Sequence, residues 1–131
     1  MTQPEWFVLV VEDEPDGQEV IAELLKYENI NTDRAQNADE ALNKLAKNKK
    51  GTYTAILIDL ALPGGMNGID LMREIRENPK YDELPCIAIT AFHTTTVRYE
   101  ALAAGFDAYF SKPLDVDTFA KALTEVIKKG S

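Results

Sequence analysis

The sequence predicts an α/β fold in which a parallel sheet is covered by helices on both faces. Short apolar segments alternate strictly with longer segments whose apolar residues recur at helical spacing, and this alternation is typical of βαβ units. Most of the short segments are apolar at nearly every position, as strands buried on both faces are. With 131 residues and 45% apolar composition, the chain has the size of one domain with its own core.

Five strand–helix pairs follow one another along the chain. Strands are expected at residues 6–12, 31–35, 53–59, 85–90 and 107–110, and helices at residues 16–27, 38–47, 69–77, 94–104 and 116–128. Nothing in the sequence repeats or separates a second unit, so residues 1–131 are expected to form a single domain with a core of about 6–128.

The first two pairs differ in polarity. The first strand is apolar on both faces, and the helix after it begins at Pro15 and Asp16, which suit a first helical turn. The second strand is short and polar, which indicates a sheet edge. The helix after it begins at residues 37–40, a sequence that resembles a capping box with Asn37 as the cap.

The remaining pairs have clear boundaries. Residues 53–59 form the most apolar run and are expected at the centre of the sheet, before a loop rich in turn formers at 62–68. The third helix stops before Pro79 and the fourth at Gly105. The fifth helix has Phe119 and Leu123 on its inward face.

Composition excludes several classes of protein. A formal net charge of −8 argues against direct nucleic-acid binding, which needs basic residues on phosphates. No apolar run approaches the roughly 20 residues of a membrane helix, and no secretory signal is visible. Cys86 is the single cysteine and is expected to be a buried core thiol. Its lack of a partner agrees with a reducing, cytoplasmic location.

Four polar side chains stand where four of the predicted strands end: Asp13, Asp59, Thr90 and Lys112. In a parallel sheet these ends share one edge, where ligands of open α/β sheets bind. Each residue has an ordinary alternative, such as a loop cap, a helix N-terminal acid, a strand threonine or a surface lysine. Those alternatives would have to hold at four successive strand ends for the grouping to be an accident.

Carboxylates dominate this predicted crevice. Glu12 and Asp13 end the first strand, Asp59 ends the third, and these strands are expected to be neighbours because the crevice forms where the chain reverses direction across the sheet. Like charges about 4 Å apart repel by about 4 kcal/mol at an effective dielectric near 20, so such a cluster either raises its pKa values or holds a cation. Hard oxygen ligands suit Mg²⁺.

The same side chains suit phosphoryl transfer. Asp59 could attack phosphorus and become an aspartyl phosphate. Lys112 could offset the charge that develops on the phosphoryl oxygens, and Thr90 could donate a hydrogen bond to one of them. Positioning and charge stabilisation are most of what this reaction requires from a protein.

From Phe7 to Ile127 the chain resembles the receiver domains of two-component response regulators, including the chemotaxis regulator. The matching segments are Val10-Val11-Glu12-Asp13-Glu14, Ile58-Asp59 with Leu62-Pro63 and Gly68, Ile89-Thr90-Ala91, and Phe110-Ser111-Lys112-Pro113. The resemblance implies a flavodoxin-like, doubly wound (βα)5 sandwich with strand order 2-1-3-4-5.

The resemblance also implies a role for each matched residue. Asp59 would accept a phosphoryl group from a sensor histidine kinase or a phosphotransfer protein. Glu12, Asp13, Asp59 and the carbonyl of Ala61 would bind Mg²⁺. Lys112 would contact the phosphoryl group, before a cis bond to Pro113. Thr90 and Tyr109 would form the switch that changes the affinity of the face made by the fourth helix, fifth strand and fifth helix for a downstream protein. No separate enzyme activity is implied beyond self-phosphorylation and slow dephosphorylation.

The sequence departs from the family pattern at a few positions. Glu12 replaces the commoner Asp, and Gly64-Gly65 lengthen the loop after Asp59 by one residue. Neither Ala61 nor Phe92, each two residues beyond a strand end, can hold a hydrolytic water with its side chain, which predicts slow self-dephosphorylation. His93 is expected on the surface or as a cap, and Trp6 in packing.

Rival phosphate-handling folds lack support in the sequence. A P-loop is excluded because acidic residues follow the first strand, and a haloacid-dehalogenase-type site needs a second Asp where Ala61 stands. A flavin-binding domain of the same topology needs loops that favour phosphate rather than an acidic pocket. The remaining alternative is a protein-interaction module of receiver fold that does not depend on phosphorylation.

Overall fold

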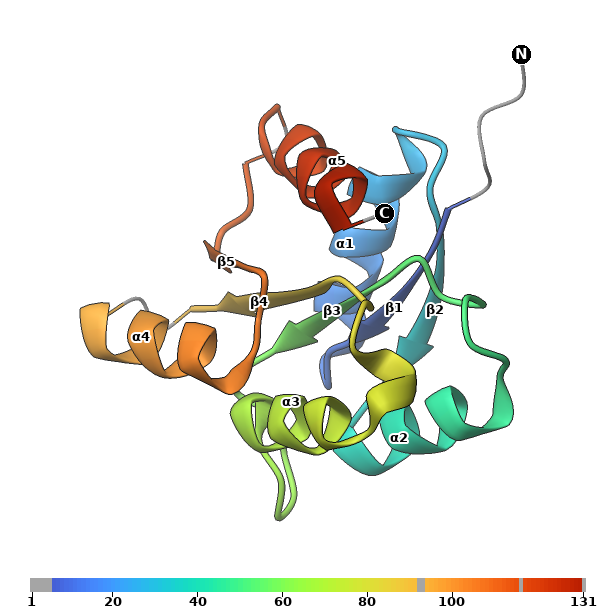
Figure 1. The fold of residues 1–131 in the computed structure, drawn as a ribbon. Coiled ribbons are helices and arrows are strands. Elements are labelled where there is room, and N and C mark those ends of the chain that lie inside the picture. The colour runs from blue at the N-terminus through green and yellow to red at the C-terminus, as the bar shows by residue number, and fades with distance from the viewer. Residues whose placement is uncertain (1–5, 92–93, 116, 131) are drawn as a thin grey trace.

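The computed structural model describes residues 6–91, 94–115 and 117–130, and it confirms the alternation of strands and helices (Figure 1). The strands are β1 (Phe7–Val11), β2 (Asn31–Ala35), β3 (Ala55–Asp59), β4 (Cys86–Thr90) and β5 (Ala108–Ser111). The helices are α1 (Pro15–Lys26), α2 (Ala38–Lys47), α3 (Gly68–Glu77), α4 (Thr95–Ala104) and α5 (Phe119–Gly130), with a short 3₁₀ helix, η1, at Pro79–Tyr81.

The sheet is parallel throughout and has the expected order β2-β1-β3-β4-β5. At the end of β1, Val11 lies opposite Ala35 of β2 on one side and Ile58 of β3 on the other. The chain therefore changes direction across the sheet between β1 and β3, so the carboxyl ends of these two strands flank the switch point where ligands of such folds bind.

Two apolar layers enclose the sheet. Leu9 and Val11 pack on the side of α2, α3 and α4, whereas Val8 and Val10 pack on the side of α1 and α5 (Figure 1). This division follows from the two-residue period of a strand, and it explains why β1 is apolar at every position. β3 and β4 are buried at all five positions, while β2 is half-exposed and forms an edge.

Asparagine side chains cap two helices on the switch-point edge. Asn37 accepts a hydrogen bond from the Glu40 amide at 2.8 Å, which is the first half of the capping box expected at α2. The complete reciprocal box stands instead at α3, where Asn67 and Asp70 each accept the other's amide. Capping of this kind satisfies orphan amide donors and typically contributes about 1 kcal/mol.

The fifth helix is described from Phe119 to Gly130, and Val116, where the prediction began, lies outside the described residues. The Asp115 side chain accepts hydrogen bonds from the amides of Asp117 and Thr118, at 2.8 and 3.1 Å, and its carbonyl accepts one from the Phe119 amide at 2.9 Å. This is the bonding of a helix N-cap, which satisfies amide donors at the start of a helix. Among the described residues, no helix is long and apolar enough to cross a membrane.

Candidate functional site

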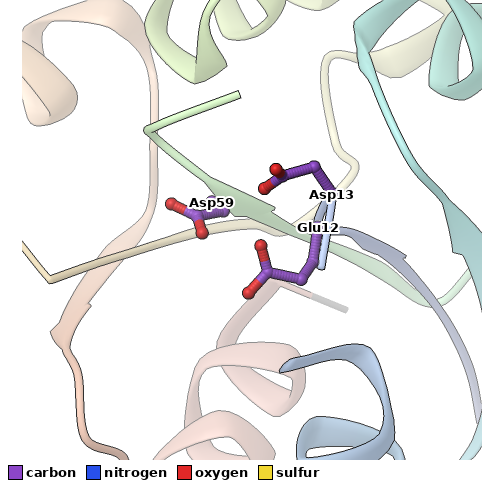
Figure 2. A group of neighbouring side chains, drawn as sticks. All are labelled: Glu12, Asp13 and Asp59. Carbon is purple, nitrogen blue, oxygen red and sulfur yellow. The ribbon is translucent and has the colours of Figure 1, made fainter. Parts of the chain in front are cut away.

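Three carboxylates converge at the carboxyl ends of β1 and β3 (Figure 2). One oxygen from each of Glu12, Asp13 and Asp59 lies within 4.8 Å of the others. Glu12 and Asp59 are buried, 2% and 5% exposed, and Asp13 is half-buried. The Glu12 amide donates to the Ala35 carbonyl at 3.0 Å, which continues the β1–β2 ladder and fixes the backbone of this corner. The acidic group therefore sits on rigid strand ends.

Lys112 joins this group from the end of β5. Its ammonium donates to Glu12 Oε1 at 2.6 Å and to Asp59 Oδ2 at 2.8 Å. Its backbone amide donates to the Thr90 carbonyl at 2.8 Å, which ties it to the end of β4. The bond between Lys112 and Pro113 is cis, as the family resemblance implies. Residues separated by up to 100 positions thus meet in one ion cluster.

The electrostatics of the cluster follow from burial. Burial raises the pKa of Glu12 to about 7, together with the hydrogen bond and charge of Asp59, while Lys112 opposes the shift. Burial alone would lower the pKa of Lys112, but its hydrogen bonds to Asp59 and Glu12 raise that pKa above its ordinary value. Among the described residues, Glu12 Oε2 is the one buried side-chain oxygen without a hydrogen-bond partner. Such an atom is costly unless something else binds it. The cluster can therefore hold a metal ion.

The sequence did not indicate a role for two residues that contact Glu12. Gln18 of α1 is buried and its amide nitrogen donates to the carbonyls of Glu12 at 2.6 Å and Ala35 at 3.2 Å, so it clamps the ends of β1 and β2. A Cβ on Gly17 would collide with Glu12 Oε1. A glycine inside a helical pattern is the signal that could have drawn attention to this position, because it costs about 1 kcal/mol relative to alanine.

The loop after β3 packs against Asp59. The Ala61 amide donates to Asp59 Oδ1 at 2.9 Å, so that both Asp59 oxygens have a protein partner. A Cβ on Gly68 would lie 2.5 Å from the Asp59 carbonyl oxygen and 2.7 Å from Leu60 Cα. The start of α3 thus approaches the end of β3 more closely than any side chain permits, which explains the glycine.

Thr90 and Tyr109 lie beside the carboxylate group rather than in it. Thr90 ends β4 and is 1% exposed, and it lies opposite Ser111 of β5. Tyr109, two residues before Ser111, is half-buried and packs on the α2–α3–α4 side of the sheet. The two-residue period of a strand puts Thr90 on that same side. Phe92 and His93, which the sequence analysis also considered, lie outside the described residues.

Comparison with known proteins agrees with this geometry. Residues 8–124 match the response regulator receiver domain family. The chemotaxis protein CheY-3 of Vibrio cholerae is 30% identical over 93% of this chain and 92% of its own length. A segment of the sensor histidine kinase CheAY of Helicobacter pylori is 32% identical over 95% of this chain and 15% of the kinase.

Solved structures share the fold. A response regulator structure from Chloroflexus aurantiacus superposes with a TM-score of 0.87 over 95% of this chain and 98% of the other, at 23% identity. The five parallel strands of this chain, in the order 2-1-3-4-5, and its five helices match flavodoxin-like receiver structures. The sequence match over residues 8–124, the strand order and the acidic corner at the switch point lead to one conclusion: this chain belongs to the response regulator receiver domains of two-component signalling.

Proposed function

We propose that Asp59 accepts a phosphoryl group from the phosphohistidine of a sensor histidine kinase or a phosphotransfer protein, and that the chain thereby relays a signal in the cytoplasm. The observation that carries this proposal is the setting of Asp59, a buried carboxylate between the Lys112 ammonium and the Ala61 amide, with Glu12 and Asp13 beside it. Family membership supports the same assignment.

The transfer balances with the groups present. An Asp59 carboxylate oxygen forms a bond to phosphorus, the phosphorus–nitrogen bond of the donor breaks, and the released imidazole takes a proton from solvent. Charge on the phosphoryl oxygens is met by Lys112, which then exchanges its present carboxylate contacts for a phosphoryl oxygen. The Ala61 amide holds Asp59 Oδ1 in place at 2.9 Å, so less motion is needed to reach an in-line geometry.

The donor set fits Mg²⁺. Glu12, Asp13 and Asp59 offer only hard carboxylate oxygens within 4.8 Å of one another, which suits a small divalent cation that keeps several waters. The unpartnered, buried Oε2 of Glu12 is the atom that such a cation or its water would satisfy. Those three side chains and the Ala61 carbonyl would hold the ion, and bound Mg²⁺ would neutralise charge on the transferring phosphoryl group.

Phosphorylation is proposed to change a partner surface through Thr90 and Tyr109. The Thr90 hydroxyl would turn toward the phosphoryl group, and Tyr109 would move into the space on the same face of the sheet. The surface of α4, β5 and α5 would then bind a downstream protein differently. Tyr99 and Leu102 of α4 are 70% and 40% exposed, so this surface already offers large apolar groups to a partner.

Intact mass spectrometry tests the proposal directly. Incubation with Mg²⁺ and acetyl phosphate is expected to add one phosphoryl group to the wild-type chain and none to Asp59→Asn, and EDTA is expected to prevent the gain. Asp82→Asn, which removes an exposed carboxylate after η1, serves as the matched control and should gain the group normally. Because some receivers ignore small donors, beryllofluoride binding is the second measurement. Failure of both would favour a phosphorylation-independent interaction module.

The lifetime of the phosphoprotein is a separate prediction. Ala61 presents only a methyl group beside Asp59, so its side chain holds no water for hydrolysis. We expect the aspartyl phosphate of the purified protein to persist far longer than seconds, and Ala61→Asn or Ala61→Glu to shorten it. Decay of the phosphorylated mass after donor removal measures this, and a lifetime of seconds in the wild type would contradict it.

A further inference from the structure

A groove lies at the opposite edge of the sheet from the carboxylates. It is formed by the segments that lead into β1, β2, β3 and β4 and by the end of α5. In Figure 1 this is the edge of the sheet at which β1 begins. Its volume is about 750 Å³, within the range of roughly 300–1,000 Å³ that holds small molecules. Phosphoryl transfer at Asp59 makes no use of it.

Aromatic side chains line this groove in fixed positions. Tyr53 is 6% exposed and its hydroxyl donates to Asp33 at 2.7 Å. The Tyr81 hydroxyl donates to the Leu45 carbonyl at 3.0 Å. Trp6 packs partly buried against the α1–α5 layer and also lines the groove. Tyr53 is almost fully covered, but Trp6 and Tyr81 are half-buried and packed against the core, so their rings offer preformed flat surfaces to a ligand.

Lysines give the groove a charge opposite to that of the whole chain. Lys49, Lys50, Lys80 and Lys128 line it, against the two acidic residues Glu28 and Glu83, although the chain as a whole carries −8. The Lys80 ammonium is held by the Asn48 carbonyl at 3.2 Å and lies 5.4 Å from the centre of the Tyr81 ring. A positive, concave, aromatic-lined site attracts an anion with an apolar body.

We propose that this groove binds a small planar anion, with its aromatic body against Trp6 and Tyr81 and its phosphate, sulfonate or carboxylate among the lysines. The size of the groove favours a small molecule over an extended peptide. An anion of this kind would be repelled from the carboxylate corner at the other edge. This second site is independent of phosphorylation and would stand even if Asp59 accepted no phosphoryl group.

Anilinonaphthalene sulfonate is a suitable probe because it combines an aromatic body with an anionic group. Trp6 is the single tryptophan of the chain, so its emission reports binding in the groove directly. We expect Trp6 emission to fall and dye emission to rise along one saturable curve with the intact, folded protein. The neutral parent, anilinonaphthalene, should bind more weakly because it lacks the anionic group.

A pair of double variants locates the site. Lys49→Ala with Lys50→Ala should raise the dissociation constant of the dye about three- to tenfold, the effect of losing two partly solvated ion pairs. The matched control, Lys26→Ala with Lys47→Ala, removes two lysines from helix ends outside the groove and should leave the constant unchanged. Thermal unfolding checks that all variants remain folded.

Competition distinguishes the sources of such a ligand. Displacement of the dye by adenosine monophosphate would assign the groove to nucleotides, and displacement by indole acetate to aromatic carboxylates. The proposal is overturned by an unchanged Trp6 emission, by equal weakening in the two double variants, by equal affinity for the neutral parent, or by failure of both competitors.

Discussion

The two edges of the sheet carry opposite chemistry. At the carboxyl edge, Glu12, Asp13 and Asp59 gather around a single Lys112 in a small corner that is mostly buried. At the amino edge, four lysines surround an open groove of about 750 Å³ with aromatic walls. One edge is built to hold a cation and a reacting phosphoryl group, and the other to receive a preformed anion.

Parallel topology accounts for part of this difference. The α-helices begin at the carboxyl edge of the sheet and end at the amino edge, so the positive ends of their dipoles lie on the side of the acidic corner. In α1, α2 and α3 the first turn carries acidic residues, namely Asp16, then Asp39 and Glu40, then Asp70. The last turns of the same three helices carry the basic residues Lys26, Lys44, Lys47 and Arg76, whereas α4 has neither. In these three helices each sign of charge lies where the helix dipole favours it.

Removal of Lys112 should have the largest effect on the carboxyl edge. Lys112→Ala leaves Glu12 and Asp59 without their shared ammonium and removes the cation that meets the phosphoryl oxygens. We expect phosphorylation by acetyl phosphate to slow about 100-fold or more, the usual cost of losing one transition-state contact. Lys26→Ala removes a lysine at the amino edge and should leave the rate unchanged. Similar slowing in both variants would mean that net charge, rather than position, matters.

Magnesium should stabilise the protein through the carboxyl edge alone. At about 100 times its dissociation constant, a ligand that binds only the folded state adds about 2.7 kcal/mol to the free energy of unfolding. We expect this rise in the wild type and in the double variant Lys49→Ala, Lys50→Ala. In Asp13→Asn most of the rise should vanish. Thermal unfolding with and without Mg²⁺ measures it. A rise that survives in Asp13→Asn would place the ion elsewhere.

The close packing of Gly17 against Glu12 can be tested by the sign of the stability change that Gly17→Ala causes in two backgrounds. Alanine is favoured over glycine inside a helix by about 1 kcal/mol, but Gly17→Ala would collide with Glu12 Oε1 and should destabilise the wild type by about 1–3 kcal/mol. In the background of Glu12→Asp, whose side chain is one methylene shorter, the same change should stabilise. Denaturant unfolding of the four proteins gives both values. The same sign in both backgrounds would show that Glu12 does not dictate the glycine.

Acid should weaken the contact of Asp33 with Lys44 and Tyr53 near the amino edge, an effect smaller than those described above. Burial alone would raise the pKa of Asp33, but hydrogen bonds from Lys44, Tyr53 and the Arg34 amide lower it below 3.8. A lowered carboxyl pKa stabilises the folded protein above the unfolded pKa, and that stabilisation is lost as the pH falls through the folded pKa. Asp33→Asn should therefore cost about 1 kcal/mol near neutral pH.

The acid dependence provides its own control. The difference in unfolding free energy between the wild type and Asp33→Asn should shrink as the pH falls below about 4, because the carboxyl then becomes protonated in both states. Asp82→Asn, at an exposed position, should show no comparable difference at any pH. If the difference in unfolding free energy between the wild type and Asp33→Asn stays constant as the pH falls, the charge of Asp33 does not contribute to stability.

The strand ends were the most predictable part of the site. Apolar strand runs end at, or just before, Glu12, Asp13 and Asp59. The spacing of the apolar residues and the polarity of the residues that follow are enough to place these carboxylates at one edge of a parallel sheet. Their meeting is confirmed. The cap of α5 was not predicted from the apolar pattern, although the Asp115 side chain accepts hydrogen bonds from two amides just before Phe119. A cap of this kind leaves no signal in the apolar period.

The amino-edge groove had no comparable signal. Its lysines come from the turn after α2, from η1 and from the last turn of α5, three segments with no shared motif. Trp6 was expected in packing, and it does pack against the α1–α5 layer, but its place in the same groove as Lys49 and Lys80 depends on how loops from distant parts of the chain come together. Loop placement follows from the packed elements that the loops connect.

The sequence by itself determined the alternation of elements, the parallel sheet and the identity of the residues at its carboxyl edge, because strand and helix periods and turn residues are local properties of the chain. Only the tertiary structure decided that Gly17 makes room for Glu12, that Gln18 clamps β1 to β2, and that a basic groove opens at the far edge. These features depend on distances between segments remote in sequence, and such distances are set when the core packs to a fixed density.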